Sequence, residues 1–266
     1  MEIEKEKEKE KEKNPDIFLD EDELEEKEDD LAKSEIIELN ELTTKENDYL
    51  IIGCYGNGSA FLKASFFKEI REQKQSFKIK FMNKEKDINK KKTLFAELYQ
   101  ITSNGKNLLI LLTKIGIKIE NENYLLNFFK EKNITYKEII CFDSLTINNF
   151  YSEKKIDQCY YIKNSKEGNN ESNCSKLPIP NNLSGFCANI FCKAEFENIP
   201  CIVFISVFGQ YDIGFDSINI FENAVNKFDF LCGKVNKDYF SKNNIDENTV
   251  RSVFNEFNSN KKSYFS

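Results

Sequence analysis

Residues 177–208 read LPIPNNLSGFCANIFCKAEFENIPCIVFISVF, and this stretch decides the fold. Apolar side chains in its first half recur at spacings of three and four, as in a helix with one buried face: Leu183, Phe186, Cys187, Ile190, Phe191 and Ala194. Asn181 or Asn182 is predicted to cap this helix. Ile199-Pro200 ends it, because proline lacks an amide donor and disfavours helical geometry in the preceding residue. Residues 201–208 contain one polar side chain and predict a strand covered on both faces. A helix leading directly into such a strand is half of a layered α/β structure.

The same alternation of strand and helix is predicted elsewhere in the chain. Residues 49–52 predict a strand that enters a glycine-rich turn, and a helix begins at Ser59 with Leu62, Phe66 and Ile70 spaced four apart. Residues 93–102 and 107–113 predict a hairpin, because Asn104-Gly105 between two strands is a strong hairpin signal. The fold class predicted is therefore α/β, with a central sheet between helices.

The remaining elements follow from similar patterns. We expect a helix around residues 124–129, strands at 138–142 and 159–162, and a turn of helix formed by Ile36, Ile37, Leu39 and Leu42. A helix capped by Asp216 or Ser217 is predicted to bury Phe221, Ala224, Val225 and Phe228. A last helix, capped by Asp246, is predicted to bury Val250, Val253, Phe254 and Phe257.

Charge divides the chain into three regions. The net charge is −7, but residues 1–47 carry 20 acids and 8 lysines, a net −12, whereas the rest carries 25 acids and 30 bases, a net +5. We predict a disordered acidic tail over residues 1–47, one folded domain over 48–257 with a mobile polar loop at 164–176, and a flexible C-terminal tail over 258–266. Within the leader, Ile17-Phe18-Leu19 is either a docking motif or a chance apolar triplet.

The chain has eight cysteines and no histidine. There is no Cys-x-x-Cys pair, and Cys187 and Cys192 both fall on the predicted buried face of one helix. We interpret the cysteines as reduced core residues and predict no metal site and no cofactor. The opening residues lack the apolar core of a signal peptide, and no apolar run is long enough to span a membrane. We therefore expect a cytoplasmic protein, with the nucleus as a second location.

Two groups of residues could support an enzyme. The turn Gly53-Cys-Tyr-Gly-Asn-Gly-Ser59 lies between a strand and a helix, where backbone amides can approach a phosphate. It lacks the lysine of a P-loop and its glycine spacing is not that of a dinucleotide-binding turn, so a tight turn is the competing interpretation. Asp143, Asp212 and Asp216 are the candidate acids, although Asp216 is equally explained as a helix cap. Nucleic-acid binding is not expected, because the lysines of residues 84–92 have no interleaved aromatic side chains.

The order of elements resembles that of the proteasome assembly chaperone family. The resemblance lies in the acidic leader, in residues 48–62, in the Leu-Pro loop, helix, Ile-Pro and apolar strand of residues 177–208, and in an aromatic penultimate residue. It implies a layered α/β/α fold around a central mixed sheet, similar to that of nucleoside phosphorylases but without their active site. It also implies a non-catalytic role in assembling the proteasome core particle, as a heterodimer with proteasome assembly chaperone 2.

The C-terminal residues Tyr264, Phe265 and Ser266 are the predicted partner-binding residues. They are similar to the hydrophobic-tyrosine-any motif with which proteasome activators and assembly chaperones enter pockets between proteasome α subunits, with phenylalanine in the tyrosine place. An aromatic ring in a groove and a terminal carboxylate paired with a lysine would give such binding. Two alternatives remain open: a nucleotide- or nucleoside-binding protein using the Gly53–Ser59 turn, and an adaptor whose acidic leader recruits basic proteins.

Overall fold

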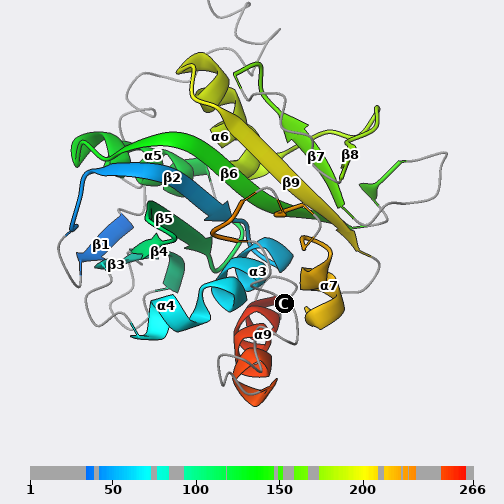
Figure 1. The fold of residues 1–266 in the computed structure, drawn as a ribbon, viewed down its shortest axis with the longest axis horizontal. Coiled ribbons are helices and arrows are strands. Elements are labelled where there is room, and N and C mark those ends of the chain that lie inside the picture. Colours follow the sequence, from blue (N-terminus) through cyan, green and yellow to red (C-terminus); the bar gives the residue numbers. More distant parts are fainter. Residues whose placement is uncertain are drawn as a thin grey trace, which may run out of the picture.

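The computed structural model describes residues 34–38, 42–72, 77–83, 93–117, 119–146, 149–151, 159–166, 174–208, 213–222, 224–226, 228–231 and 247–261. In these residues the chain forms one nine-stranded mixed sheet with helices on both faces (Figure 1). The predicted α/β/α architecture is thereby confirmed. No helix in the described segments is long and apolar enough to cross a bilayer.

Four parallel strands form the centre of the sheet. The strand order is β1-β3-β4-β5-β2-β6-β9-β7-β8, in which β5, β2, β6 and β9 run parallel and β1, β3, β4 and β7 pair with antiparallel neighbours. The strands are β1 (Ser34–Glu38), β2 (Glu46–Gly53), β3 (Phe77–Asn83), β4 (Thr93–Ser103), β5 (Lys106–Thr113), β6 (Thr135–Thr146), β7 (Cys159–Lys163), β8 (Ser175–Lys176) and β9 (Cys201–Phe208). Parallel strands buried on both faces explain the continuous apolar runs of the sequence.

The helices form two layers that bury separate cores. One layer contains α3 (Asn57–Ser65), α4 (Phe67–Glu72), α7 (Phe215–Asn219) and α9 (Glu247–Lys261), and the other contains α5 (Ile119–Glu131) and α6 (Gly185–Phe196). Alternate residues of each central strand face opposite layers, as where Ile51 packs with the α3 side while Leu50 and Ile52 pack with the α5 side. Each such buried aliphatic side chain contributes about 1.5–3 kcal/mol to folding.

The stretch from residue 177 to 208 folds largely as predicted. The strand β9 has the predicted bounds, and α6 buries Phe186, Cys187, Ile190 and Ala194 against the sheet. The cap prediction was wrong, because Ser184 is the N-cap residue of α6. Asn181 instead pairs with Tyr151, accepting a hydrogen bond from its amide at 2.7 Å. Its side chain therefore fixes the loop before the helix.

The predicted hairpin is confirmed. The strands β4 and β5 pair antiparallel from Ala96 opposite Thr113 to Ser103 opposite Lys106. Asn104 and Gly105 both have positive φ, 50° and 72°, which the tightest hairpin turns require at both central residues.

Three predictions near the ends of the domain were wrong. Residues 34–38 form the edge strand β1, not a turn of helix, and β2 begins at Glu46, so the folded domain includes residues assigned to the acidic tail. Helix α7 begins at Phe215, which places Asp216 within the helix. In place of the predicted helix, the described residues 220–222, 224–226 and 229–231 form turns and bends. Helix α9 continues to Lys261, so residues 258–261 are helical, not part of a flexible tail.

The predicted mobile loop at 164–176 is ordered at both of its ends. The side chain of Asn164 is buried, donates to the carbonyl of Ile199 at 2.7 Å and accepts from the amide of Cys201 at 3.0 Å. Residues 175–176 form β8 beside β7. A buried amide with both ends bonded stabilises this connection.

Candidate functional site

The carboxyl ends of the central parallel strands meet at one edge of the sheet. After β2 the chain forms α3 and then β3, β4 and β5, which lie on one side of β2 in the sheet. After β6 it forms β7, β8 and β9, which lie on the other side. In open α/β sheets, ligands bind where the directions of successive connections diverge in this way. The gap between the ends of β2 and β6 is therefore the first place to look for a site.

The glycine-rich turn at this edge is packed against protein backbone. A Cβ atom on Gly58 would lie 2.1 Å from the carbonyl oxygen of Phe142, and one on Gly53 would lie 2.7 Å from the Cα of Ser59. Gly56 has φ of 104° and is the N-cap residue of α3. The glycines thus allow α3 to approach β6 and turn sharply into the helix.

Polar groups in the turn have partners within the protein. The hydroxyl of the fully buried Ser59 shares its one proton between the carbonyls of Gly53 at 2.5 Å and Thr113 at 2.9 Å, and its amide donates to the carbonyl of Cys54. Asn57, also buried, donates to the hydroxyl of Ser206 at 3.3 Å. These contacts favour the interpretation of residues 53–59 as a tight turn over that of a nucleotide cradle.

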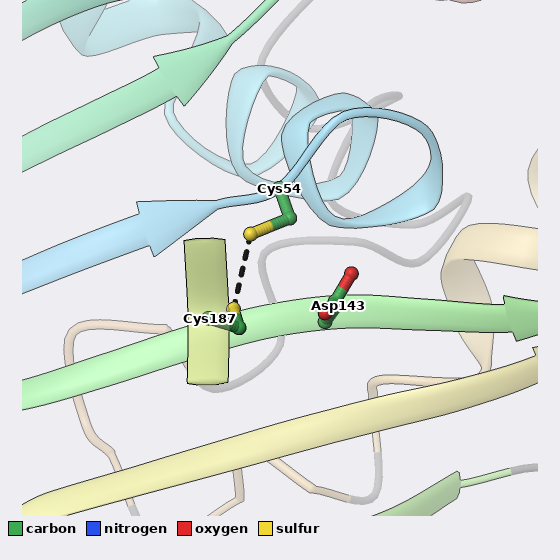
Figure 2. A group of neighbouring side chains, drawn as sticks. All are labelled: Cys54, Asp143 and Cys187. Carbon is green, nitrogen blue, oxygen red and sulfur yellow. Dashed lines mark hydrogen bonds between the residues drawn. The ribbon is translucent and has the colours of Figure 1, made fainter. Parts of the chain in front are cut away.

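Asp143 lies at this edge, as predicted, but within β6, which continues to Thr146. Figure 2 shows it beside Cys54 at the end of β2 and Cys187 in the first turn of α6. Burial raises the pKa of Asp143 to about 6, although hydrogen bonds from the Ser144 amide and the Cys187 thiol act in the opposite direction. Near pH 6, the Asp143 carboxyl group is therefore ionised in about half of the molecules.

Cys54 and Cys187 form a close pair of buried thiols. Their sulfur atoms are 3.0 Å apart, and both cysteines are free. The Cys187 contact and burial raise the pKa of the Cys54 thiol well above its usual value, and the contact with Cys141 and burial do the same for Cys187. The interpretation of these cysteines as reduced is consistent with the structure, but Cys192 was placed wrongly, because it is exposed.

Sequence reasoning missed that these groups converge. The reactive atoms of Cys54, Asp143 and Cys187 all lie within 4.8 Å of one another. They come from three elements that are far apart in the sequence, so no local spacing pattern could identify them. The one available signal was that each stands next to the carboxyl end of a central strand or the start of a helix.

A second polar cluster joins α9 to the sheet. Lys114, which is 2% exposed, forms an ion pair of 2.9 Å with the buried Glu97 and a second ion pair with Glu256 of α9. Lys63 of α3 also pairs with Glu256, and the hydroxyl of Tyr99 donates to Glu97 at 3.0 Å. Burial lowers the pKa of Lys114, but the two carboxylates outweigh it, so the lysine stays charged.

This cluster was not predicted either. The sequence does contain a signal for it: Glu97 is a charged residue within an apolar strand, and Lys114 is one that directly follows an apolar strand. The ring of Phe257 lies under the Lys114 ammonium, 4.8 Å from it. The cluster therefore holds the last helix of the chain against the sheet.

The remaining predicted residues fall outside the part of the chain that the structure describes. These are the partner-binding residues Tyr264, Phe265 and Ser266, the candidate acid Asp212 and the triplet Ile17–Leu19. The helix α9 ends at Lys261, five residues before Ser266.

No protein-family model matches the sequence, and no curated protein matches it. Solved structures share the fold. PbaB of Pyrococcus furiosus, described as an archaeal proteasome activator, superposes with a TM-score of 0.56 at 13% identity over 84% of this chain and 96% of its own. PbaA of the same organism, described as an archaeal homolog of proteasome-assembly chaperone, gives 0.54 at 13% identity over 86% and 95%. A Thermoplasma acidophilum protein of unknown function gives 0.52 at 14% identity over 82% and 87%.

Proposed function

We propose that this chain is a non-catalytic chaperone for assembly of the proteasome core particle, a counterpart of proteasome assembly chaperone 1. The observation that carries the proposal is the similarity of fold to PbaA and PbaB, which extends over at least 84% of this chain and 95% of theirs. The sequence supports it at the C-terminus, where Tyr264-Phe265-Ser266 is similar to a proteasome-binding motif.

The mechanism proposed is binding without chemistry. The chain pairs with proteasome assembly chaperone 2, and the heterodimer covers one face of the forming α ring. The C-terminal residues enter pockets between α subunits, where the ring of Phe265 and the terminal carboxylate make the contacts. The heterodimer thereby blocks unproductive association at that face. The cytoplasm is the proposed location, and the nucleus is the second.

The ion-pair cluster at α9 supports this use of the tail. A binding segment is more effective when it leaves a fixed point on a rigid domain, because fewer conformations are lost on binding. Glu256 and Phe257 lie on α9, which ends at Lys261, and both contact Lys114 on the sheet side. The helix thus gives the tail a fixed origin.

The nucleotide-binding alternative has less support. The glycines of residues 53–59 contact backbone, and Ser59 bonds to two carbonyls of the protein. A nucleotide that binds the native state would raise the melting temperature. A screen of nucleosides and nucleotides by thermal shift tests this alternative directly.

The decisive experiment is affinity purification of the tagged chain from its own cells. The full chain, a chain lacking residues 264–266 and a chain beginning at Ser34 are compared. Recovery of α subunits and a related chaperone by the full chain and by the chain beginning at Ser34, with fewer α subunits recovered without the tail, supports the proposal. Recovery of neither kind of partner by the full chain contradicts it, and loss only on removing residues 1–33 favours the adaptor.

A further inference from the structure

Four buried thiols and one carboxyl group gather between α6 and the sheet. Cys54 directly follows β2, Asp143 lies on β6 and Cys187 lies on α6 (Figure 2). Cys141 lies two residues before Asp143 on the same strand. The thiol of Cys141 contacts both Cys187 and Cys201, the first residue of β9. A protein core needs no such concentration of sulfur beside a half-buried carboxylate, because a cysteine used only for packing behaves as a small apolar side chain.

The spacing of these atoms is close to that of a tetrahedral thiolate site. Zinc binds thiolate sulfur at about 2.3 Å and carboxylate oxygen at about 2.0–2.2 Å, so two ligand atoms of one ion lie about 3.5–3.8 Å apart. The Cys54 and Cys187 sulfurs, at 3.0 Å, lie closer than this, and the group that includes an oxygen of Asp143 spans at most 4.8 Å. The two sulfurs would have to move apart by about 0.5–0.8 Å to reach the ligand spacing of one zinc ion.

A disulfide explains the arrangement less well. The bond would need the sulfurs to approach to about 2.05 Å and would leave the adjacent carboxyl group without a role. A divalent cation uses the carboxyl group as a ligand and reduces the negative charge that two thiolates and a carboxylate would otherwise concentrate there.

The helix ends add favourable electrostatics. Cys187 is the third residue of α6, and Cys54 lies three residues before α3 begins. The amino end of a helix carries a partial positive charge and stabilises a thiolate nearby. The amino ends of α6 and α3 lie close to these two cysteines in the chain and would offset part of the negative charge left over after a divalent cation is bound.

We propose that Cys54, Cys187 and Asp143 bind one zinc ion through two thiolate sulfurs and one carboxylate oxygen. Each thiol gives up its proton to solvent as its sulfur bonds to zinc, and the zinc changes neither charge nor oxidation state. The ion joins the end of β2, β6 and the start of α6, so it stabilises the edge of the sheet where these elements meet. This inference does not depend on the proposed function.

The first test is metal analysis of the full chain, purified under reducing conditions without chelator. One zinc per chain is the expected content. Replacing zinc by Co²⁺ should produce a sulfur-to-cobalt charge-transfer absorption in the near ultraviolet, which only thiolate ligation gives. Less than one-tenth equivalent of zinc, together with no such absorption after adding Co²⁺ to the reduced protein, overturns the proposal.

Matched variants separate ligation from folding. Cys187→Ser should abolish the cobalt absorption, and Asp143→Asn, which keeps the shape of the side chain, should weaken zinc binding at least tenfold. Cys192→Ser, at an exposed position of the same helix, and Asp229→Asn, also exposed, should both behave as the unaltered chain. Near-ultraviolet circular dichroism of each variant shows whether it is folded.

Two further outcomes would contradict the proposal. Equal zinc binding by folded Asp143→Asn and Cys187→Ser proteins would place the metal elsewhere. A Cys54–Cys187 disulfide found by peptide mapping of protein alkylated directly in cell lysate would assign the pair to redox chemistry. By contrast, a zinc-dependent rise in melting temperature that is present in Cys192→Ser and absent in Cys187→Ser would support it.

Discussion

At the scale of single residues, the closeness of α3 to the sheet depends on Gly58. The carbonyl of Phe142 occupies the space that any side chain at Gly58 would need. The same contact holds the ring of Phe142 4.9 Å from the ring of Phe61 in the core on the α3 side. Glycine is therefore required at this position by packing and not by a ligand.

Gly58→Ala should destabilise the fold by about 1–3 kcal/mol, toward the upper end because the obstacle is a backbone carbonyl that cannot rotate away. Gly116→Ala is the matched control, because a Cβ atom there meets nothing within 4 Å. Urea denaturation of both variants measures the difference. Equal stability of the two would show that α3 does not pack as described.

A second prediction at this scale concerns Phe265. If the tail binds as proposed, Phe265→Tyr restores the hydroxyl of the related motif and adds one hydrogen bond. One hydrogen bond contributes about 0.5–1.5 kcal/mol, so affinity for α-subunit pockets should rise about two- to tenfold. Titration of tail peptides against isolated proteasome core particles measures it. Adding one glycine after Ser266, which displaces the carboxylate, should reduce the affinity of both peptides.

At the scale of elements, α9 is held by a charged cluster whose strength depends on pH. Burial raises the pKa of Glu256, but the charge and hydrogen bonds of Lys114 and Lys63 outweigh burial, and the net pKa lies below the usual 4.5. A carboxylate with a depressed pKa contributes stability above its unfolded pKa and loses it as the pH falls through the folded value. The attachment of α9 should therefore weaken in acid, below about pH 4.5.

Glu256→Gln tests this attachment. The variant should be about 1 kcal/mol less stable than the original chain at pH 7, a modest loss because the Glu256 side chain is 38% exposed. The difference should shrink as the pH falls from 5 toward 3. Denaturation across this range, with the exposed Glu131→Gln on α5 as control, measures it. A difference that stays constant with pH would contradict the ion-pair account.

At the scale of the whole molecule, the domain begins before the boundary that the charge pattern suggests. Strand β1 pairs with β3 over five residues, from Ser34 opposite Asn83 to Glu38 opposite Ile79. The amide and hydroxyl of Thr43 both donate to the buried Gln100 at 2.8 Å. Residues before Asp48 are therefore part of the fold.

Two truncations should separate leader from domain. A chain beginning at Ser34 should keep its melting temperature within about 2 °C, because it retains every described strand and helix and loses only a highly charged segment. A chain beginning at Asp48 should melt at least about 5 °C lower, because it loses β1, the start of β2 and the partners of Gln100. Differential scanning calorimetry gives both values. Equal melting temperatures would mean that β1 adds nothing to stability.

The fold was more predictable than the site, for a physical reason. A strand that is buried on both faces, such as β9, has a continuous apolar sequence and is therefore recognisable. Asn104-Gly105 predicts a turn because both residues readily adopt positive φ. Both polar clusters, the one of thiols and a carboxyl group and the one around Lys114, form only when particular strands become neighbours in the sheet. The spacing of residues along the chain does not predict which strands will be neighbours. The strand at residues 34–38 was missed because the spacing of Ile36, Ile37, Leu39 and Leu42 also fits one face of a helix.

The sheet divides the interior into two cores with no residue in common. Two substitutions in the same core should therefore show a coupling energy, whereas substitutions in different cores should have additive effects on stability. Phe61→Leu combined with Phe142→Leu should deviate from the sum of the single effects by about 0.5 kcal/mol or more, because their rings touch at 4.9 Å. Phe61→Leu combined with Phe128→Leu, one on each side of the sheet, should add. Substitutions in the core on the α9 side should therefore have the same effect whatever is substituted in the core on the thiol side. Only the sum of their effects on the stability of the fold limits how many are tolerated.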